Sequence, residues 1–376
     1  MAKYRFDQVA RECRTTFKGD KNGMPIVGLE HLVPNEMLVR DFEVDTENTF
    51  TKSFKQGQIL FGRRRAYQQK AGVAQFDGIC SGDITVIEAI PGKIEPNLLP
   101  FIVQNEQFFE HAVQGSAGSL SPRVKWEHLA SYEIELPTME KQRVLADKLW
   151  TAYRLKESYK KLLAATDEMV KSQFIEMFGE RTTTPVGYYI KDSFPGDWGK
   201  EDLDGTGVKV IRTTNFTNFG KLNLFEVVTR SIEERKIQKK QILKYDTILE
   251  RSGGTADNPV GRVVLFEEDE QYLCNNFTQV LRFKDIDPRF AFYALFYFYQ
   301  MNKTSIRSMG SKTTGIQNLN MSKYLEIGIP NADEDEQKQF VSIAEQADKS
   351  KLVGHCSMNA MNVEISKLIN KKISII

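Results

Sequence analysis

Two long stretches of the chain carry apolar residues at alternating steps of three and four. The first stretch follows this spacing at Leu145, Leu149, Ala152, Tyr159, Leu163, Thr166, Val170 and Met177. The second follows it at Phe340, Ala344, Ala347, Met358, Met361, Ile365 and Leu368. This spacing is the seam of a coiled coil. Each stretch therefore predicts a long helix, and two helices with matching seams should pack together.

The predicted helices have matching beginnings and matching polar interruptions. Each begins soon after a proline, Pro137 or Pro330, and carries acidic residues at its start, where the helix dipole favours negative charge. The first should end near residues 178–179, because glycine is a usual helix stop. Lys156 and Lys351 interrupt the two seams at an offset of 195 (351 − 156 = 195).

The rest of the chain repeats at a similar offset. Gly115-Ser116 matches Gly310-Ser311 (310 − 115 = 195), and Gln142 matches Gln337 (337 − 142 = 195). Two further matched segments have other offsets, which indicates different loop lengths on one core: 58–63 with 246–251, and Ile134-Glu135-Leu136-Pro137 with Ile327-Gly328-Ile329-Pro330. A repeat of this kind indicates two copies of one structural unit.

We therefore predict an α+β protein with two tandem domains, each followed by a long helix. The expected boundaries are a first domain at 1–136, a first helix at 137–179, a second domain at 180–329 and a second helix at 330–376. Short β-type runs such as 83–87 and 262–266 alternate with turn residues in both domains. The helices should pack together as a coiled coil, and the repeat relates the two halves of the chain.

Composition narrows the class of protein only a little. The chain has 376 residues, with 41% hydrophobic and 27% charged residues and a net charge of +1, which are values of an ordinary globular protein. Its longest apolar stretch, 290–299, is shorter than the ~20 residues that span a bilayer. Since no secretory signal is evident, we expect a cytoplasmic protein without membrane segments. The four cysteines occur singly, so we expect no metal site.

The net charge of the chain gives no indication of DNA binding, but local clusters of basic residues do. No acidic residue occurs from Lys55 to Phe76. The candidate DNA-contacting residues of this segment are Arg63, Arg64, Arg65, Tyr67, Gln68, Gln69 and Lys70. Arginine forks and glutamine amides suit phosphates and base edges. The alternative is a solvated basic loop.

Three further segments hold candidate DNA contacts. They supply Ser116, Ser119, Arg123 and Lys125 in the first domain, and Arg251, Ser252, Asn258, Arg262, Ser311, Lys312, Thr313, Thr314, Gln317 and Asn318 in the second. Small hydroxyls and glycine-rich turns allow a close approach to phosphate. A flexible turn at 251–255 and capping of the next element at 116 and 311 are the alternatives.

Enzyme motifs are incomplete. Asn258-Pro259-Val260 has half of the pattern of amino-methyltransferases and no glycine-rich turn before it. Asp333 with Glu336-Gln337-Lys338 imitates a nuclease site but falls at a predicted helix start. We expect no catalytic residue in this chain. A stand-alone DNA-modifying enzyme and a coiled-coil scaffold are the alternative functions.

The two domains, each closed by an Ile-x-[Leu/Ile]-Pro segment and a Gln-bearing helix, resemble the specificity subunits of type I restriction-modification systems. Family-like segments are 58–61, 246–251, 310–311 and 169–179, the last ending in Phe174-Ile175-Glu176-Met177-Phe178-Gly179. The first copy departs from the family at Gln58, where a Gly-Asp pair is more usual. The resemblance covers essentially the whole chain.

The resemblance implies a non-catalytic subunit with a defined set of partners. Each variable domain would be a target-recognition domain for one half of a bipartite double-stranded DNA target. The helices would form the family's spacer, an antiparallel coiled coil that gives the two halves a pseudo-two-fold relation. This spacer would also dock two methyltransferase subunits, and restriction subunits would complete the complex. We expect no cofactor in this chain, since S-adenosylmethionine, ATP and Mg would be held by the partner subunits.

Overall fold

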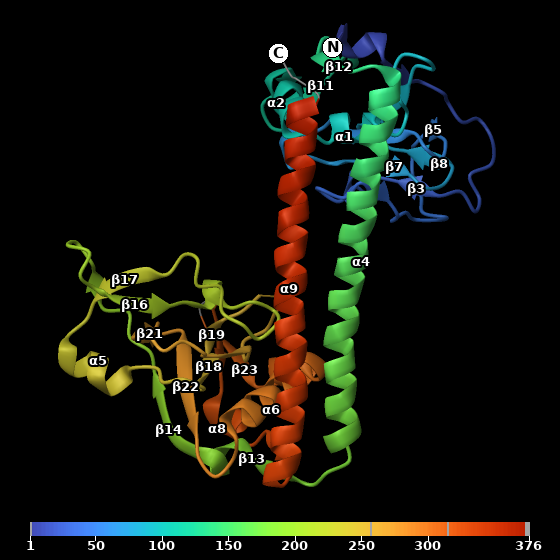
Figure 1. Cartoon of the computed structure of the whole chain (residues 1–376). Coiled ribbons are helices and arrows are strands. Elements are labelled where there is room, and N and C mark those ends of the chain that lie inside the picture. The colour runs from blue at the N-terminus through green and yellow to red at the C-terminus, as the bar shows by residue number, and fades with distance from the viewer. Residues whose placement is uncertain (1, 256–257, 314–315, 373–376) are drawn as a thin grey trace. The chain divides into compact units, whose positions relative to one another are not determined.

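The computed structural model describes residues 2–255, 258–313 and 316–372. The chain divides into two compact units. Unit 1 comprises Met1–Leu162 and Val353–Ile376, and unit 2 comprises Leu163–Leu352. Each unit therefore contains one predicted recognition domain and part of each long helix (Figure 1).

Unit 1 contains the first recognition domain. Its strands are β1 (Ala2–Arg5), β2 (Ala10–Cys13), β3 (Ile26–Val27), β4 (Leu38–Val39), β5 (Lys52–Phe54), β6 (Ile59–Gly62), β7 (Ala71–Ala74), β8 (Gly78–Cys80), β9 (Ile84–Ala89), β10 (Ser116–Ala117), β11 (Arg123–Val124) and β12 (Glu133–Leu136). Its short helices are the 3-10 helices η1 (Phe6–Gln8), η2 (Leu29–His31) and η3 (Ala66–Gln68) and the α-helices α1 (Leu99–Val103), α2 (Glu106–Gln114) and α3 (Trp126–Ala130).

The main sheet of unit 1 is buried on both faces. Its strand order is β2-β9-β6-β7-β4, and a smaller sheet has the order β3-β8-β5. Successive residues of β6 point to different cores, because Ile59 and Phe61 pack with α1 and α2 whereas Leu60 packs with the smaller sheet. The period of two along a strand explains this division. The layers are thus helices, main sheet and small sheet.

Unit 2 repeats this construction. Its strands are β13 (Thr183–Pro185), β14 (Ile190–Pro195), β15 (Lys200–Glu201), β16 (Val208–Ile211), β17 (Val228–Ser231), β18 (Thr247–Glu250), β19 (Ser252–Gly253), β20 (Val263–Leu265), β21 (Tyr272–Cys274), β22 (Thr278–Phe283), β23 (Gly310–Thr313), β24 (Ile316–Leu319) and β25 (Gly328–Pro330). Its short helices are α5 (Glu234–Lys240), α6 (Pro288–Met301), α7 (Lys303–Ser308) and α8 (Met321–Leu325).

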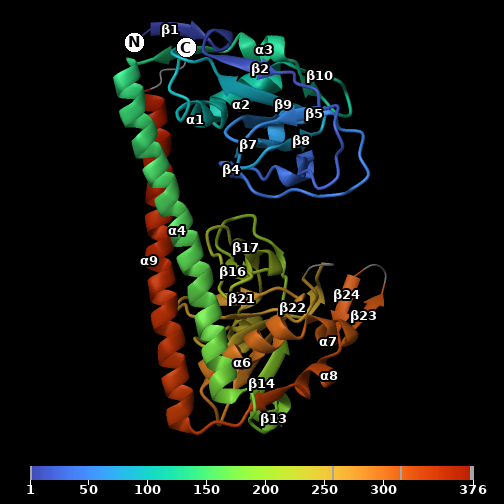
Figure 2. The same cartoon turned by 90° about the vertical axis from the view of Figure 1, so that its right-hand side faces the viewer.

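Helix α6 is the centre of the core of unit 2. Phe290 of α6 packs on one side with Phe174 and Phe340 of the long helices, and α6 residues cluster with Leu249 of β18 on the other side. The β14-β22-β18-β20 sheet packs its other face against the β15-β17-β16-β21 sheet. Figure 2 shows α6 between its sheet and the long helices. The sequence prediction of an α+β fold is confirmed.

The long helices are α4 (Met139–Phe178) and α9 (Glu334–Lys372). In unit 2 they run antiparallel, because Phe174 contacts Phe340 whereas Asp167, earlier in α4, bonds to Lys351, later in α9. In unit 1, Leu149 of α4 clusters with Ile369 of α9. Every seam residue predicted in α4 is buried or half-buried. The predicted helix pair is confirmed.

A matched glutamine fixes the start of each long helix. Gln142 accepts a hydrogen bond from the Glu95 backbone N–H and donates one to the Pro137 carbonyl, both at 2.9 Å. Gln337 makes the same two bonds with the Asp287 N–H and the Ala332 carbonyl, also at 2.9 Å. The repeated glutamines therefore tie each long helix to the start of the helical layer of its own domain.

Each recognition domain is closed by its own first and last strands. β1 pairs antiparallel with β12, and β13 pairs antiparallel with β25. The strand that enters each domain thus lies beside the strand that leaves it for a long helix. This arrangement makes each domain a self-contained segment of the chain.

A network of ion pairs links the recognition domain of unit 2 to its helices. Asp348 of α9 bonds to Lys221 at 2.9 Å and to Lys351 at 2.8 Å, and it accepts a bond from the Tyr293 hydroxyl at 3.2 Å. Lys351 also bonds to Asp167 of α4 at 2.7 Å. Burial alone would raise the pKa of Asp348, but Lys221 and Lys351 outweigh burial and hold that pKa below its ordinary value.

We expect Asp348→Asn to lower the free energy of unfolding by about 2 kcal/mol at neutral pH, because it removes the charge that the two lysines pair with. The folded-state pKa of Asp348 is depressed, so its stabilisation is present above the unfolded pKa of ~3.9 and is lost as pH falls through the folded value. Urea unfolding from pH 7 to pH 3 should show the two proteins converging in acid. Asp269→Asn, which breaks an exposed pair with Lys244, is the control and should change stability less. Equal stability of wild type and Asp348→Asn at pH 7 would contradict the prediction.

Candidate nucleic-acid interface

Two candidate segments of the first domain form one surface. The loop that follows β6 lies against the β10–β11 hairpin, because the Val124 N–H donates to the Arg63 carbonyl at 3.0 Å and the Arg65 N–H donates to the Pro122 carbonyl at 2.8 Å. These two segments, residues 63–70 and 115–125, are called the domain 1 surface below. The sequence predicted both segments without showing that they meet.

Asp83 organises the arginines of the domain 1 surface. Arg123 donates to it from Nε at 2.6 Å and from Nη2 at 3.2 Å, and Arg64 lies 3.5 Å from it. Arg64 also donates to the Ser121 hydroxyl at 3.0 Å. The hydrogen bond from Arg123 holds the pKa of Asp83 below its ordinary value, although burial opposes this. Two of the candidate arginines are therefore oriented by one carboxylate.

The remaining candidates of the domain 1 surface differ in exposure. Arg65 has a left-handed backbone with φ 55° and is exposed, and the Tyr67 ring is 57% exposed. Ser119 and Lys125 are also exposed, whereas Gln68 and Gln69 are half-buried.

Two candidates bond to the backbone of their own domain: Lys70 donates to the Leu29 carbonyl and Ser116 to the Ala112 carbonyl, both at 2.8 Å.

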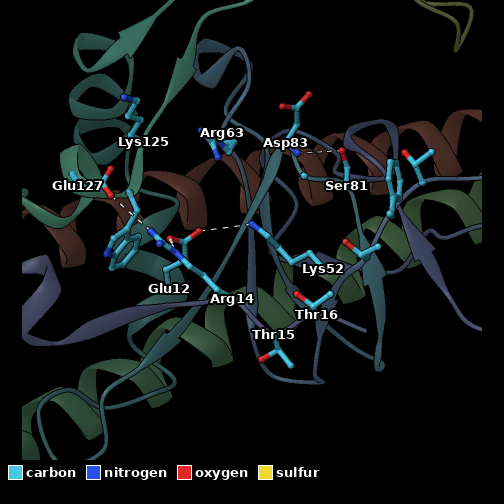
Figure 3. A pocket seen from close by; sticks show the side chains of 15 residues that line it. Glu12, Arg14, Thr15, Thr16, Lys52, Arg63, Ser81, Asp83, Lys125 and Glu127 are labelled. Atoms are coloured by element: carbon cyan, nitrogen blue, oxygen red, sulfur yellow. Dashed lines mark hydrogen bonds and ion pairs between the residues drawn. The ribbon is translucent and has the colours of Figure 1, made fainter. Parts of the chain in front are cut away.

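A polar recess of about 790 Å³ opens beside this surface. Its lining includes Arg63 and Lys125 of the surface and neighbouring residues such as Asp83, Glu12 and Lys52 (Figure 3). Glu12 bonds to Arg14 at 2.7 Å and lies 3.7 Å from Lys52. The Nε atom of Arg63 is buried without a hydrogen-bond partner. The recess is therefore lined by both cationic hydrogen-bond donors and anionic hydrogen-bond acceptors.

The second domain builds the equivalent surface with a three-stranded sheet. Its order is β19-β24-β23, which joins the 251–253 segment to the antiparallel strands 310–313 and 316–319. The Leu319 N–H donates to the Arg251 carbonyl at 2.8 Å, as the Val124 N–H does to Arg63 in the first domain. Residues 251–253, 310–313 and 316–319 are called the domain 2 surface below. Both domains thus join an arginine loop to a hairpin by the same hydrogen bond.

Several candidates of the second domain are held by internal contacts. Ser252 is buried and donates to Asn318 at 2.7 Å across the β19–β24 pair. Arg262 donates to both carboxylate oxygens of Glu250, at 2.6 and 3.2 Å, and its side chain is only 17% exposed. The guanidinium of Arg262 is therefore engaged within the domain, and Arg262 is left out of the interface proposed below.

The other candidates of the second domain lie at or near the domain 2 surface. Ser311 is exposed, whereas Arg251, Asn258 and Gln317 are half-buried. Arg251 donates to Gln279 at 3.4 Å. Lys312 and Thr313 belong to β23, but their side chains are outside the described part of the structure, and Thr314 lies outside the described residues altogether.

Two acceptors that organise the arginines of these domains, Asp83 and Glu250, could not be recognised from the sequence. Asp83 follows a Ser-Gly turn, and Glu250 ends a buried strand. Their arginine partners are set by the pairing of strands, so the local sequence of either residue carries no signal for the contact. The parallel between Arg63 and Arg251, by contrast, was visible in the repeat.

Within the described ranges, no group of three or more His, Cys, Asp or Glu side chains could hold a metal ion. None of the helices that the structure describes combines the length and the apolar character needed to cross a membrane.

Comparison with known proteins identifies the family. The model of the type I restriction modification DNA specificity domain matches residues 9–165 and 194–353, one match for each recognition domain. The chain therefore belongs to the family of type I restriction-modification DNA specificity subunits. Proteins of this family recognise DNA targets and are generally non-catalytic.

Individual relatives agree with this assignment. The specificity subunit of the type I restriction enzyme EcoDI of Escherichia coli is 24% identical over 191 residues, which span 47% of this chain and 41% of that protein. The type I restriction-modification S subunit of M. genitalium has a similar fold, with a TM-score of 0.61, 12% identity and coverage of 100% of this chain and 96% of that chain. A chain from a study of complex assembly in a type I restriction-modification system gives a TM-score of 0.54 at 13% identity, with 98% of each chain covered.

Proposed function

We propose that this chain selects a bipartite double-stranded DNA target, with the domain 1 surface reading one half-site and the domain 2 surface reading the other. The observation that supports this proposal best is the repeated construction of the two surfaces, in which the hairpin bonds to the carbonyl of Arg63 or Arg251. Arginine is suited to both phosphate and guanine contacts. The chemistry of methylation and cleavage would be supplied by partner subunits.

Exposed apolar residues on the long helices support docking of these partners. In unit 1, α4 exposes Leu155 at 49% and Leu162 at 59%, and their seven-residue spacing places them on one face of the helix. In unit 2, α4 exposes Met169 and Ile175. Exposed apolar side chains gathered on one face mark interaction sites. We propose one methyltransferase subunit on the helices of each unit, with restriction subunits joining through that complex.

A selection from random DNA tests the proposal. The chain, mixed with its methyltransferase subunit, should enrich two short motifs separated by a gap of fixed length in a gel-shift selection. A coiled-coil scaffold without DNA recognition would enrich no motif. The chain alone should neither methylate nor cleave the selected DNA.

We expect Arg63→Ala combined with Arg65→Ala to flatten the salt dependence of DNA binding. Each phosphate contact contributes about −0.9 to the slope of log affinity against log salt, so the magnitude of the slope should fall by up to about 2. Arg64 is kept because it bonds to Ser121 within the domain. The control is Lys3→Ala with Lys93→Ala, two exposed lysines outside the surface, and it should preserve the slope. An unchanged slope in the arginine variant would favour a solvated loop.

A further inference from the structure

The two recognition domains differ in charge at one equivalent position. The Arg63 N–H donates to the Asp83 carbonyl at 2.9 Å, and the Arg251 N–H donates to the Phe277 carbonyl at 2.8 Å. Asp83 and Phe277 therefore occupy matching places beside the two arginine loops. The first domain has a carboxylate there, whereas the second has an aromatic ring that is 41% exposed.

The carboxylate of Asp83 bonds to only two of the three guanidinium nitrogens of Arg123. Arg123 donates to Asp83 from Nε and Nη2. Its Nη1 group makes no bond to that carboxylate. Arg64 is held between Asp83 and the Ser121 hydroxyl. Figure 3 shows Asp83 at the recess that Arg63 also lines. The side chain of Asp83 is only 20% exposed, which limits its motion.

A carboxylate near a DNA-binding surface has two opposing effects. It repels phosphates, which lowers the affinity for any DNA sequence. It also fixes the orientation of its arginine partners, which reduces the entropy that they lose when they bind a base. Arginine with two aligned donors reads O6 and N7 of guanine, and such a contact discriminates against other bases. A fixed arginine therefore increases selectivity more than affinity.

Resting on the DNA-reading function proposed above, we propose that Asp83 is a positioning residue that sets the base preference of the first recognition domain. It orients Arg123 toward a guanine of the first half-site, while Arg64, held between Asp83 and Ser121, helps to fix the carboxylate in place. The second domain has Phe277 at this place, so its base preference does not depend on a carboxylate at this position.

The test compares Asp83→Asn with Asp77→Asn. Asp77 lies in the same domain and pairs with Lys55 at 2.8 Å, so both variants lose one negative charge. Each full chain, with its methyltransferase subunits, selects from DNA with both half-sites randomised. We expect Asp83→Asn to reduce the preference for one guanine in the first half-site about tenfold. The second half-site should be unchanged, and Asp77→Asn should select the wild-type target.

Arg123→Lys provides a second variant in case Asp83→Asn does not fold. It keeps the positive charge but loses the fork that Asp83 orients, so the same loss of guanine preference is expected. The proposal is overturned if the folded variants keep that preference, if Asp77→Asn loses it equally, or if the wild-type first half-site contains no guanine. A wild-type protein that selects no half-site would instead overturn the proposed function itself.

Discussion

A chain in which residues 180–376 are replaced by a second copy of residues 1–179 is expected to select a symmetric DNA target. Both halves of that target should be the first half-site of the wild-type protein, in opposite orientations. The expectation follows from the repeat, because a second copy of the first domain would take the place of the second domain. Selection from random DNA, with the methyltransferase subunit present, measures the outcome directly.

The structure supports the folding of this duplicated chain. In unit 1 the residues of α9 that pack against α4 include Ile365, Leu368 and Ile369. The residues that would replace them, 195 positions earlier (365 − 195 = 170, 368 − 195 = 173, 369 − 195 = 174), are Val170, Gln173 and Phe174, so two of the three positions stay apolar. The β1–β12 strand pair would close the copied domain as it closes the original.

The reciprocal chain, with two copies of residues 180–376, is the matched control. It should select a different symmetric target that is built only from the second half-site. An asymmetric target from either folded chain would show that a half-site is read by residues of both domains. The proposal that each domain reads one half-site by itself would then be wrong.

Leu155→Asp combined with Leu162→Asp is expected to remove one of the two proposed methyltransferase subunits from the complex. Each exposed leucine would bury most of its apolar surface when the methyltransferase subunit docks. An aspartate at the same place would lose this burial and would place an unpaired charge in the interface, so the affinity of that subunit should fall about a thousandfold. Methylation of the DNA strand served by that subunit should be lost. Native mass spectrometry of the complex measures the stoichiometry.

Lys161→Asp is the control for this prediction, since it places an acidic side chain at another exposed position of α4. It should retain both methyltransferase subunits and wild-type methylation. A Leu155 and Leu162 variant that is folded and still carries two subunits would place the docking surface elsewhere.

The sequence predicted the long helices well because their seam depends on local spacing. Leu149, Val170 and Phe340 lie in the seams that the spacing predicts, and all three are buried. The match between Gln142 and Gln337 was also visible as a repeat. Their function was not, because the backbone groups that they bind, such as the N–H of Glu95, are brought near only by the fold.

The charged contacts of the recognition surfaces could not be predicted in this way. Arg123 reaches Asp83 across 40 residues, and Arg262, which immediately precedes strand β20, reaches Glu250 of β18. Both arginines occur in basic or polar segments that resemble DNA-binding loops. Strand register decides which arginine finds an internal carboxylate, and register follows from the pairing of the whole sheet.

The contribution of α9 to unit 1 has a consequence for synthesis on the ribosome. Residues 139–162 of α4 are translated long before residues 353–372 of α9, which complete the cluster around Leu149 and Tyr153. An apolar face of the nascent chain therefore lacks its partner while the entire second domain is being made. Such a face is prone to aggregate or to pair with another nascent chain. Production of this protein should consequently depend on chaperones that shield the first helix until its partner has left the ribosome.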